Sequence, residues 1–239
     1  QFNLAAHPFL NTAVPMSWCD QGLYLNERPL FVLDPLWHAG AYYVQEASSM
    51  FIQHLLHHLN MDTKSIVLDL CAAPGGKSTH LLELANISLT ALEINQGRLA
   101  KVNENITRLG LSAKLLVGDA SKPELWWDKK QFDRILADTP CSATGIIRRH
   151  PDILYLRRES DFVGLKITQQ QILRSLWDLL KPGGELLYVS CSIFPEEGEE
   201  QIQLFLEEHP NALRLNSLNQ LLPSEWHDGF FYGKLQKLT

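Results

Sequence analysis

The chain has few cysteines and none of the patterns that usually organise them. Its 239 residues include four, at Cys19, Cys71, Cys141 and Cys191, with no C-x-x-C pair among them. This spacing argues against a zinc knuckle and against the disulfide framework of a small secreted protein. We therefore expect free thiols in a reducing cytoplasm, and a free thiol can act as a nucleophile.

Long apolar runs are also missing. No stretch approaches the roughly 18 residues that a membrane span needs, and the N-terminus does not resemble a signal peptide. Hydrophobic residues make up 45% of the chain and charged residues 20%, as in an ordinary globular protein. We expect a monomer without a membrane partner. We expect no metal either: His54, His57 and His58 have helical spacing, but no nearby carboxylate or cysteine completes a ligand set, which favours a solvated helix face.

Basic residues are scarce and unevenly placed. The net charge of −6 argues at first against nucleic acid, because phosphates attract Lys and Arg. Residues 193–210 hold six glutamates and no Lys or Arg, whereas residues 145–174 hold six basic and three acidic residues. The basic segment is therefore a candidate nucleic-acid surface, with a solvated face as the alternative.

From residue 65 onward, short apolar runs alternate with helical patterns. The sequence predicts strands over residues 65–70, 89–94, 113–118, 132–138 and 185–191. It predicts helices over residues 77–85 and 96–110, the second capped by Asn95. It predicts one further helix before the last strand and one after it. This alternation predicts βαβ units and a mostly parallel, doubly wound α/β sheet, which binds ligands at the carboxyl ends of its strands.

The two later helices carry clear apolar faces. The first should place Ile172, Leu173, Leu176 and Leu180 on one face before "KPGG" stops it. The second should turn Ile202, Phe205 and Leu206 inward and its glutamates outward. Residues 1–55 are instead aromatic, turn-rich and weakly alternating, which predicts a small N-terminal α+β subdomain packed on a sheet domain of residues 56–239.

The segment "LDLCAAPGGKST" follows the first of these strands directly and opens a helix. Its small residues let the backbone approach a ligand, and the amides of Gly75, Gly76 and Lys77 would lie at a helix N-terminus, which holds a carboxylate or phosphate. It lacks both G-x-G-x-x-G and the Walker spacing, which disfavours dinucleotides and nucleoside triphosphates. A tight turn without a ligand is the alternative.

Three acids follow strands, namely Glu93, Asp119 and Asp138. An acid after the second strand suits a ribose diol, and one in the next loop can accept from the exocyclic amine of adenine. Acids around such a pocket also suit a cation. S-Adenosyl-L-methionine contains adenine, ribose, a sulfonium cation and a carboxylate, so it fits the whole set.

Three motifs in this order and spacing resemble those of the RNA cytosine-5 methyltransferases: "DLCAAPGGKSTHLLE", "DTPCSATGIIRRHPDI" and "YVSCSIFPEEGEEQI". "GIIRRHPDILYLRRESD" and "DGFFYGKL" are similar in particular to the bacterial 16S ribosomal RNA enzymes of the Sun/Fmu (RsmB) type. The resemblance covers residues 65–235. Such proteins usually carry a further N-terminal helical RNA-binding domain, and with Gln1 as the first residue we expect this chain to be a fragment.

The resemblance implies a Rossmann-like, seven-stranded class I methyltransferase sheet, S-adenosyl-L-methionine as cofactor and RNA as partner, with 16S rRNA as the expected substrate. The candidate cofactor residues are Cys71, Ala72, Ala73, Pro74, Gly75, Gly76, Lys77, Glu93, Asp119 and Asp138.

The chemistry needs one attacking thiol, and the chain offers two. Carbon 5 of cytosine is not nucleophilic enough to be methylated directly, but a thiolate adding to carbon 6 makes the ring an enamine. Cys141 has the Pro-Cys context that DNA cytosine-5 methyltransferases use for attack. The resemblance to the RNA family implies instead that Cys191 attacks and Cys141 assists breakdown of the adduct. It also implies that Asp138 contacts the ring nitrogen and amino group and that Lys77 lines the pocket.

The target base must leave its stack to reach such a pocket. The basic residues after Cys141 could hold the displaced backbone: Arg148, Arg149, His150, Arg157 and Arg158. Two alternatives remain. The enzyme could act on transfer RNA or on DNA, or the chain could be a non-catalytic RNA-binding ribosome-assembly factor that holds the cofactor without turnover.

Overall fold

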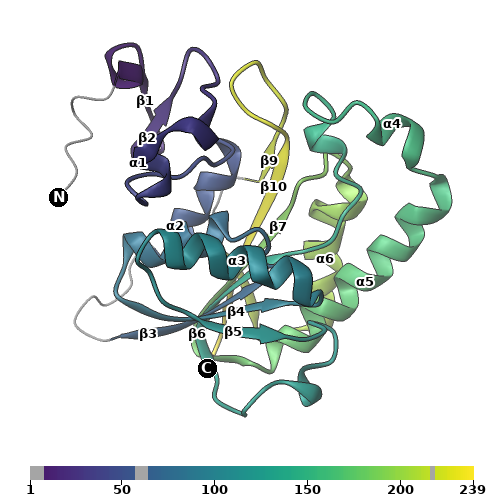
Figure 1. Ribbon diagram of the computed structural model, residues 1–239. Coiled ribbons are helices and arrows are strands. Elements are labelled where there is room, and N and C mark those ends of the chain that lie inside the picture. Colours follow the sequence, from purple (N-terminus) through teal and green to yellow (C-terminus); the bar gives the residue numbers. More distant parts are fainter. Residues whose placement is uncertain (1–7, 57–63, 216–218) are drawn as a thin grey trace.

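The computed structural model describes residues 8–56, 64–215 and 219–239, and within these one large sheet forms the centre of the molecule (Figure 1). Its strand order is β5-β4-β3-β6-β7-β10-β8, with β9 pairing beside β10. The strands are β3 (Ser65–Leu70), β4 (Ile87–Glu93), β5 (Lys114–Val117), β6 (Phe132–Asp138), β7 (Leu180–Ser190), β8 (Ala212–Leu215), β9 (Gln220–Leu221) and β10 (Phe230–Lys237).

The pairing confirms the predicted fold class. Strands β3 to β7 pair in parallel, and β10 runs antiparallel to β7, β8 and β9. Seven strands follow the predicted sheet, and the two-residue β9 is an addition that makes eight in the described part of the chain. Because β3, β4, β6 and β7 are parallel, the loops that follow them all meet at one carboxyl edge.

Helices cover both faces of the sheet (Figure 1). They are α2 (Gly76–Leu84), α3 (Gln96–Arg108), α5 (Glu159–Trp177) and α6 (Glu199–Glu208). Asn95 caps α3 as predicted, since its side chain accepts from the Arg98 backbone N at 3.0 Å. On the other face the apolar stripe of α5 and the inward residues of α6 pack into one core with the strands.

Two details of these helices differ from the sequence prediction. Leu180 is not part of the α5 face, because α5 ends at Trp177 and Leu180 begins β7, paired with Phe132 of β6. Backbone pairing within the sheet overrides the helical periodicity there, although Leu180 is still buried. The glutamates of α6 itself are exposed or half-buried as predicted, but Glu197, just before the helix, is fully buried.

The region before β3 is built from short elements. These are β1 (Val14–Met16), β2 (Cys19–Tyr24), α1 (Pro35–His38) and the 3-10 helices η2 (Pro8–Asn11), η3 (Phe31–Leu33) and η4 (Ser48–Leu56). Arg108 of α3 ties this region to the sheet by donating to the backbone oxygens of Trp37 (2.6 Å) and Tyr42 (3.0 Å). Its division from the rest as a subdomain stays a prediction, and the prediction for the side chains of His54, His57 and His58 falls outside the described structure.

In the described ranges, no helix is long and apolar enough to cross a membrane. The same residues contain no group of three or more His, Cys, Asp or Glu side chains arranged for a metal ion.

Candidate active site

The loop after β3 turns tightly into α2. Gly75 adopts φ +105°, which favours glycine, and a Cβ there would lie in tight contact, 3.2 Å from the Cα of Val102. The Gly75 backbone N donates to Ala72 O at 2.7 Å. Gly76 and Lys77 begin α2, and the first backbone N–H groups of a helix have no partner within it. The positive end of α2 therefore lies at the carboxyl edge of the sheet.

Glu93, at the end of β4, offers an open acceptor. It is 1% exposed; its Oε1 accepts from the Asn95 backbone N at 3.1 Å and lies 3.5 Å from Arg98 Nη1. Its Oε2 is buried and has no hydrogen-bond partner. A buried acceptor without a donor is unfavourable. This oxygen therefore fits a ligand donor such as a ribose hydroxyl.

Asp119 differs from Glu93 because its carboxylate already has donors. Oδ1 accepts from the backbone N (2.9 Å) and hydroxyl (2.7 Å) of Ser121, and Oδ2 lies 3.5 Å from Lys122 Nζ. Burial acts to raise the pKa of Asp119, but the hydrogen bonds from Ser121 and the charge of Lys122 outweigh it and lower that pKa. The side chain remains 32% exposed, so it can still meet a ligand.

Lys77 and Asp138 form an ion pair at the carboxyl edge of the sheet. Lys77 Nζ lies 2.6 Å from Asp138 Oδ2, and it stands 5.6 Å above the ring centre of Phe230. Burial acts to lower the pKa of Lys77, but the charge and hydrogen bond of Asp138 outweigh it and raise that pKa. The ion pair thus connects the start of α2 to the end of β6, and Lys77 stays protonated.

The two predicted cysteines meet. Cys141 Sγ and Cys191 Sγ are 3.3 Å apart, because each follows one of the adjacent parallel strands β6 and β7. Gly145 N donates to Cys191 O at 2.9 Å, which joins the two loops. The contact with Cys141 lowers the pKa of Cys191 against the effect of burial, and Lys77 acts in the same direction. The same contact, together with burial, raises the pKa of Cys141.

Asp69 is a buried acid that the sequence prediction missed. It is 0% exposed in β3, where one oxygen accepts from the Ser78 hydroxyl and the other, Oδ1, has no partner. Burial raises its pKa to about 7. Cys71 lies near Asp138, Glu93 and Asp69, and burial followed by these charges raises its pKa to about 12. Cys71 is therefore a protonated thiol in the loop. An acid inside the apolar run "SIVLDL" was the sequence feature that could have identified Asp69 as a buried carboxylate.

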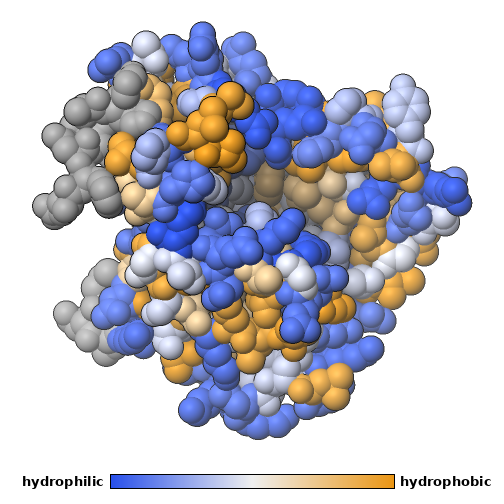
Figure 2. All heavy atoms as spheres, in the orientation of Figure 1, coloured by the Kyte–Doolittle hydropathy of each residue, from blue (hydrophilic) through white to orange (hydrophobic). Residues whose placement is uncertain are grey.

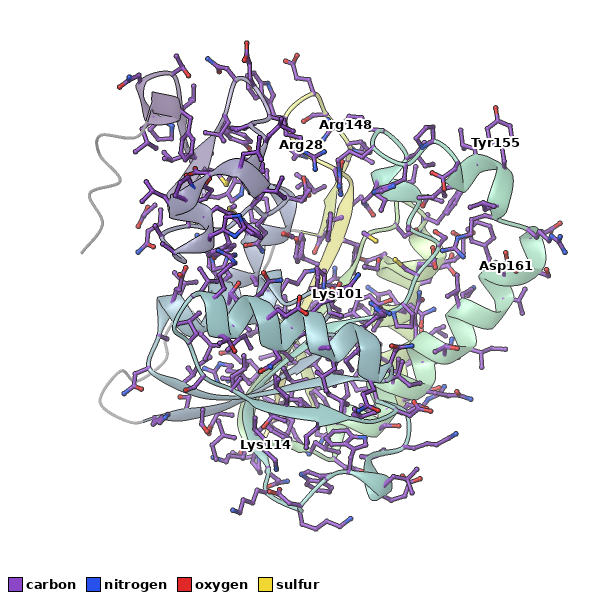
Figure 3. All side chains as sticks on the ribbon, in the orientation of Figure 1. Arg28, Lys101, Lys114, Arg148, Tyr155 and Asp161 are labelled. Carbon is purple, nitrogen blue, oxygen red and sulfur yellow. The ribbon has the colours of Figure 1, made fainter. Side chains whose placement is uncertain are left out.

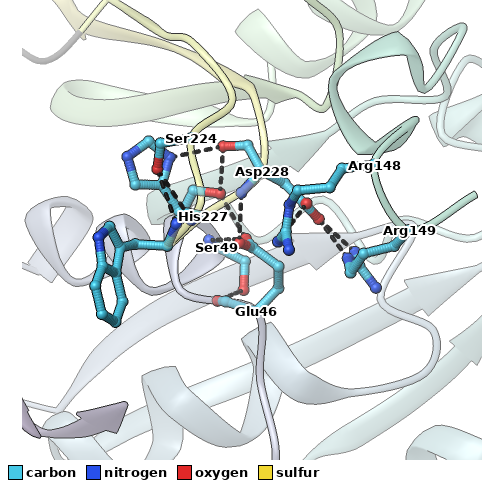
Figure 4. Close-up of polar contacts among 9 residues, drawn as sticks. Glu46, Ser49, Arg148, Arg149, Ser224, His227 and Asp228 are labelled. Atoms are coloured by element: carbon cyan, nitrogen blue, oxygen red, sulfur yellow. Dashed lines mark hydrogen bonds and ion pairs between the residues drawn. The ribbon is translucent and has the colours of Figure 1, made fainter. Parts of the chain in front are cut away.

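The candidate RNA-binding residues separate into three groups. Arg148 and Arg149 pair with Asp228, which is fully buried, at 3.1 and 2.6 Å (Figure 4). Arg157 supports the cysteine loop by donating to Ser142 O at 2.8 Å and to Cys141 O at 3.3 Å.

His150 and Arg158 are exposed. Sequence reasoning did not identify Asp228 as a partner, and it also missed Tyr155, which is 88% exposed in the short helix α4 (Ile153–Leu156).

The arrangement of these groups leaves a hollow on the face shown in Figure 2, between the N-terminal region, α3 and the α4–α5 side. Arg148 lies on one side of it and Tyr155 on the other (Figure 3). A cavity of about 800 Å³ lies between the N-terminal region and α2, and its lining includes Tyr24, Trp226, Arg148 and Arg149.

Comparison with known proteins agrees with this geometry. Residues 56–236 match the family model described as 16S rRNA methyltransferase RsmB/F. Ribosomal RNA small subunit methyltransferase B of Klebsiella pneumoniae is 48% identical over 203 residues, which are 81% of this chain and 46% of that protein. The chain thus spans about half the length of the curated relatives it matches.

Two solved structures share the fold over most of the chain. PH0851 is 32% identical with a TM-score of 0.85, covering 94% of this chain and 54% of that one. NSun6 from Pyrococcus horikoshii, solved with SFG, is 26% identical with a TM-score of 0.76, covering 89% and 57%. Because the family model matches residues 56–236, which are most of the chain, the chain belongs to the RsmB/F family of 16S rRNA methyltransferases.

Proposed function

We propose that the chain transfers a methyl group from S-adenosyl-L-methionine to carbon 5 of a cytosine in RNA, with 16S rRNA as the substrate. Its main support is the pair of thiols 3.3 Å apart beside the Lys77–Asp138 ion pair. Membership of the RsmB/F family supports the rRNA substrate. We further propose that a reduced, monomeric form acts in the cytoplasm, with residues 1–55 as a subdomain on the methyltransferase domain of residues 56–239.

The residues at the carboxyl edge fit the cofactor. The first amides of α2, at Gly76 and Lys77, would hold its carboxylate, and the unpartnered Glu93 Oε2 would accept from its ribose. Asp119 would meet the adenine amine, and the small residues 71–76 would let the backbone approach the ligand. When bound, the cofactor supplies an electrophilic methyl group.

The chain's own groups then perform three tasks. The Cys191 thiolate adds to carbon 6 of cytosine, forming a C–S bond and moving electron density onto carbon 5. The Lys77 ammonium stabilises the negative charge that the addition creates on the ring, and Asp138, 2.6 Å from it, accepts from the amino group. In release, a base removes the proton of carbon 5 and the C–S bond breaks. Cys141, 3.3 Å from Cys191, is placed to assist that elimination.

The exposed basic and aromatic side chains around the hollow would contact the RNA strand. The side chains of Arg158 and His150 are exposed and would contact phosphates. The exposed ring of Tyr155 offers a surface on which a base can stack. Arg148 and Arg149 keep 44% and 43% of their side chains exposed while they pair with Asp228. They can therefore contact RNA without leaving that partner.

Methyl transfer from labelled S-adenosyl-L-methionine to purified 16S rRNA tests the proposal, with transfer RNA and DNA of matched length as alternative substrates. We expect label in 16S rRNA, and bisulfite mapping should place it at one cytosine. Label only in transfer RNA or DNA would overturn the substrate, and cofactor binding without any labelled product would favour a non-catalytic RNA-binding protein.

A further inference from the structure

Glu197 is a fully buried carboxylate that the proposed chemistry does not use. It ends the short 3-10 helix η7 (Pro195–Glu197), shortly after Cys191 in the chain, and is 0% exposed. Among the ion pairs of the described residues none involves it. Burying a carboxylate without a cation is unfavourable unless hydrogen-bond donors surround it. The donors around Glu197 therefore indicate its role.

These donors hold the loop that carries Cys141. Glu197 Oε1 accepts from the Ser142 backbone N at 2.8 Å and from Gln169 Nε2 at 3.1 Å, and Oε2 accepts from the Ser142 hydroxyl. Gln169 also donates to Pro140 O at 2.9 Å. Both chain neighbours of Cys141 are thus fixed, one directly by Glu197 and the other through Gln169.

The main chain of Glu197 is bound to the strand that leads to Cys191. Its carbonyl oxygen accepts from the Tyr188 hydroxyl at 2.8 Å and from the Ser190 hydroxyl at 2.9 Å, and Ser190 directly precedes Cys191. One residue therefore connects the two cysteine-bearing segments, whose sulfurs lie 3.3 Å apart.

Charged groups act on both thiols. The Glu197 carboxylate opposes ionisation of Cys141. Cys191 meets Asp138, which opposes its ionisation, and the Lys77 ammonium, which favours it. Because only Cys191 has a cation among these neighbours, the proton of the S–H···S contact is placed on Cys141. The other titratable groups that face the pair are Tyr188 of β7 and Tyr232 of β10.

We propose that Glu197 is a positioning residue that holds the Cys141 thiol as hydrogen-bond donor to Cys191 and thereby makes Cys191 the thiol that ionises. This role rests on the proposed function, in which Cys191 attacks. It explains why two chemically equal thiols take different parts in one reaction: Cys141 keeps its proton beside a buried carboxylate, and Cys191 loses its proton beside an ammonium.

Alkylation of the reduced protein by iodoacetamide over a pH series tests this, with the two cysteines quantified separately by mass spectrometry. In the unsubstituted chain we expect Cys191 to react at least about tenfold faster than Cys141 near neutral pH. Glu197→Gln keeps the shape and removes the charge. It should lower that ratio at least about fivefold, because Cys141 then ionises more readily.

Two further variants keep the experiment decisive. Glu196→Gln changes an exposed glutamate next in sequence and should leave the ratio and the pH profile unchanged. Ser142→Ala removes one donor to Glu197 and should shift the ratio in the same direction by less, which covers the case of an insoluble Glu197→Gln protein. An unchanged ratio in Glu197→Gln, or in Ser142→Ala if the former does not fold, would overturn the proposal.

The alkylation needs neither RNA nor cofactor, so its outcome is independent of the methyl-transfer assay. A chain that methylates RNA but shows no change of ratio on substitution would reject the role of Glu197 alone. A chain that shows the change but methylates no RNA would reject the proposed function alone.

Discussion

The cofactor side and the cysteine side of the site are built in opposite ways. On the cofactor side, Glu93 keeps a buried oxygen without a partner, and α2 presents its N-terminal amides. On the cysteine side the groups are paired within the protein, as Lys77 with Asp138, Cys141 with Cys191 and Glu197 with Ser142.

The difference follows from what each side must do. A binding surface gains affinity from polar atoms that only the ligand satisfies, because their desolvation is already part of the folded state. Reacting groups need fixed positions and fixed proton locations before the substrate arrives. The comparison therefore predicts that substitutions on the two sides affect different measurements.

Cys191→Ala should have the largest effect. It removes the sulfur proposed to attack, so methyl transfer to RNA should fall by at least about 1000-fold. The cofactor affinity should stay within about twofold of the original, because Cys191 is not among the groups expected to contact the cofactor. Radiolabel transfer and calorimetric titration with S-adenosylhomocysteine measure the two quantities. Residual transfer above a few per cent would contradict the assignment of the nucleophile.

Asp69 is buried in β3, where it accepts from Ser78 of α2. Its substitution should change the free energy of unfolding. Burial raises the folded-state pKa of Asp69 to about 7 from its ordinary value of 3.8, so the folded chain binds more protons than the unfolded one between these values. The contribution of Asp69 to the stability of the unsubstituted protein should fall as pH rises from about 4 to about 7.

Asp69→Asn lacks this titration and should gain up to roughly 4 kcal/mol relative to the original over the same range. Urea unfolding at pH 5 and pH 8 measures the difference. An equal difference between the two proteins at both pH values would show that Asp69 is ionised in both states.

Glu93→Ala should affect cofactor binding and leave the thiols unchanged. Loss of a hydrogen bond to a charged acceptor corresponds to about 1.5–3 kcal/mol, or a dissociation constant roughly 10- to 100-fold higher. Asp119→Asn is the matched comparison. Because Ser121 and Lys122 already occupy the Asp119 carboxylate, it should raise the constant by less than about fivefold. Equal losses in the two variants would mean that the open oxygen of Glu93 has no special role.

The basic segment should show the smallest effects, and they should differ between its members. Arg158→Ala should reduce RNA affinity a few-fold and lower the slope of its salt dependence by about 1, without a change in Tm. Arg149→Ala should lower Tm as well, because it removes one of two cations from the buried Asp228. Filter binding at several salt concentrations and thermal unfolding separate the two. An unchanged Tm for Arg149→Ala would contradict a structural role for that pair.

The sequence predicted the strands β3 to β7 because they depend on local patterns. Apolar runs define β3, β4, β6 and β7, and parallel pairing of β6 with β7 then brings the residues that follow them together. The end of α5 was predicted less well. Leu180 continues the helical spacing, and only its pairing with Phe132 assigns it to a strand.

The buried acids could not be predicted for a different reason. Asp69, Glu197 and Asp228 are charged residues, which are rarely fully buried, and their partners Ser78, Ser142 and Arg149 are known only once the chain has folded. A glutamate in "FPEEGEE" is expected on the surface from composition alone. Its burial depends on donors that are far away in the sequence.

The covalent RNA adduct of the Cys141→Ala protein tests the central claim most directly. The protein is incubated with S-adenosyl-L-methionine and 16S rRNA, and the RNA-linked peptide is isolated under denaturing conditions and sequenced by mass spectrometry. The account predicts that a methylated adduct accumulates on the peptide that contains Cys191, because the bond forms and is not released. Absence of any adduct while methylation continues at the original rate would contradict it.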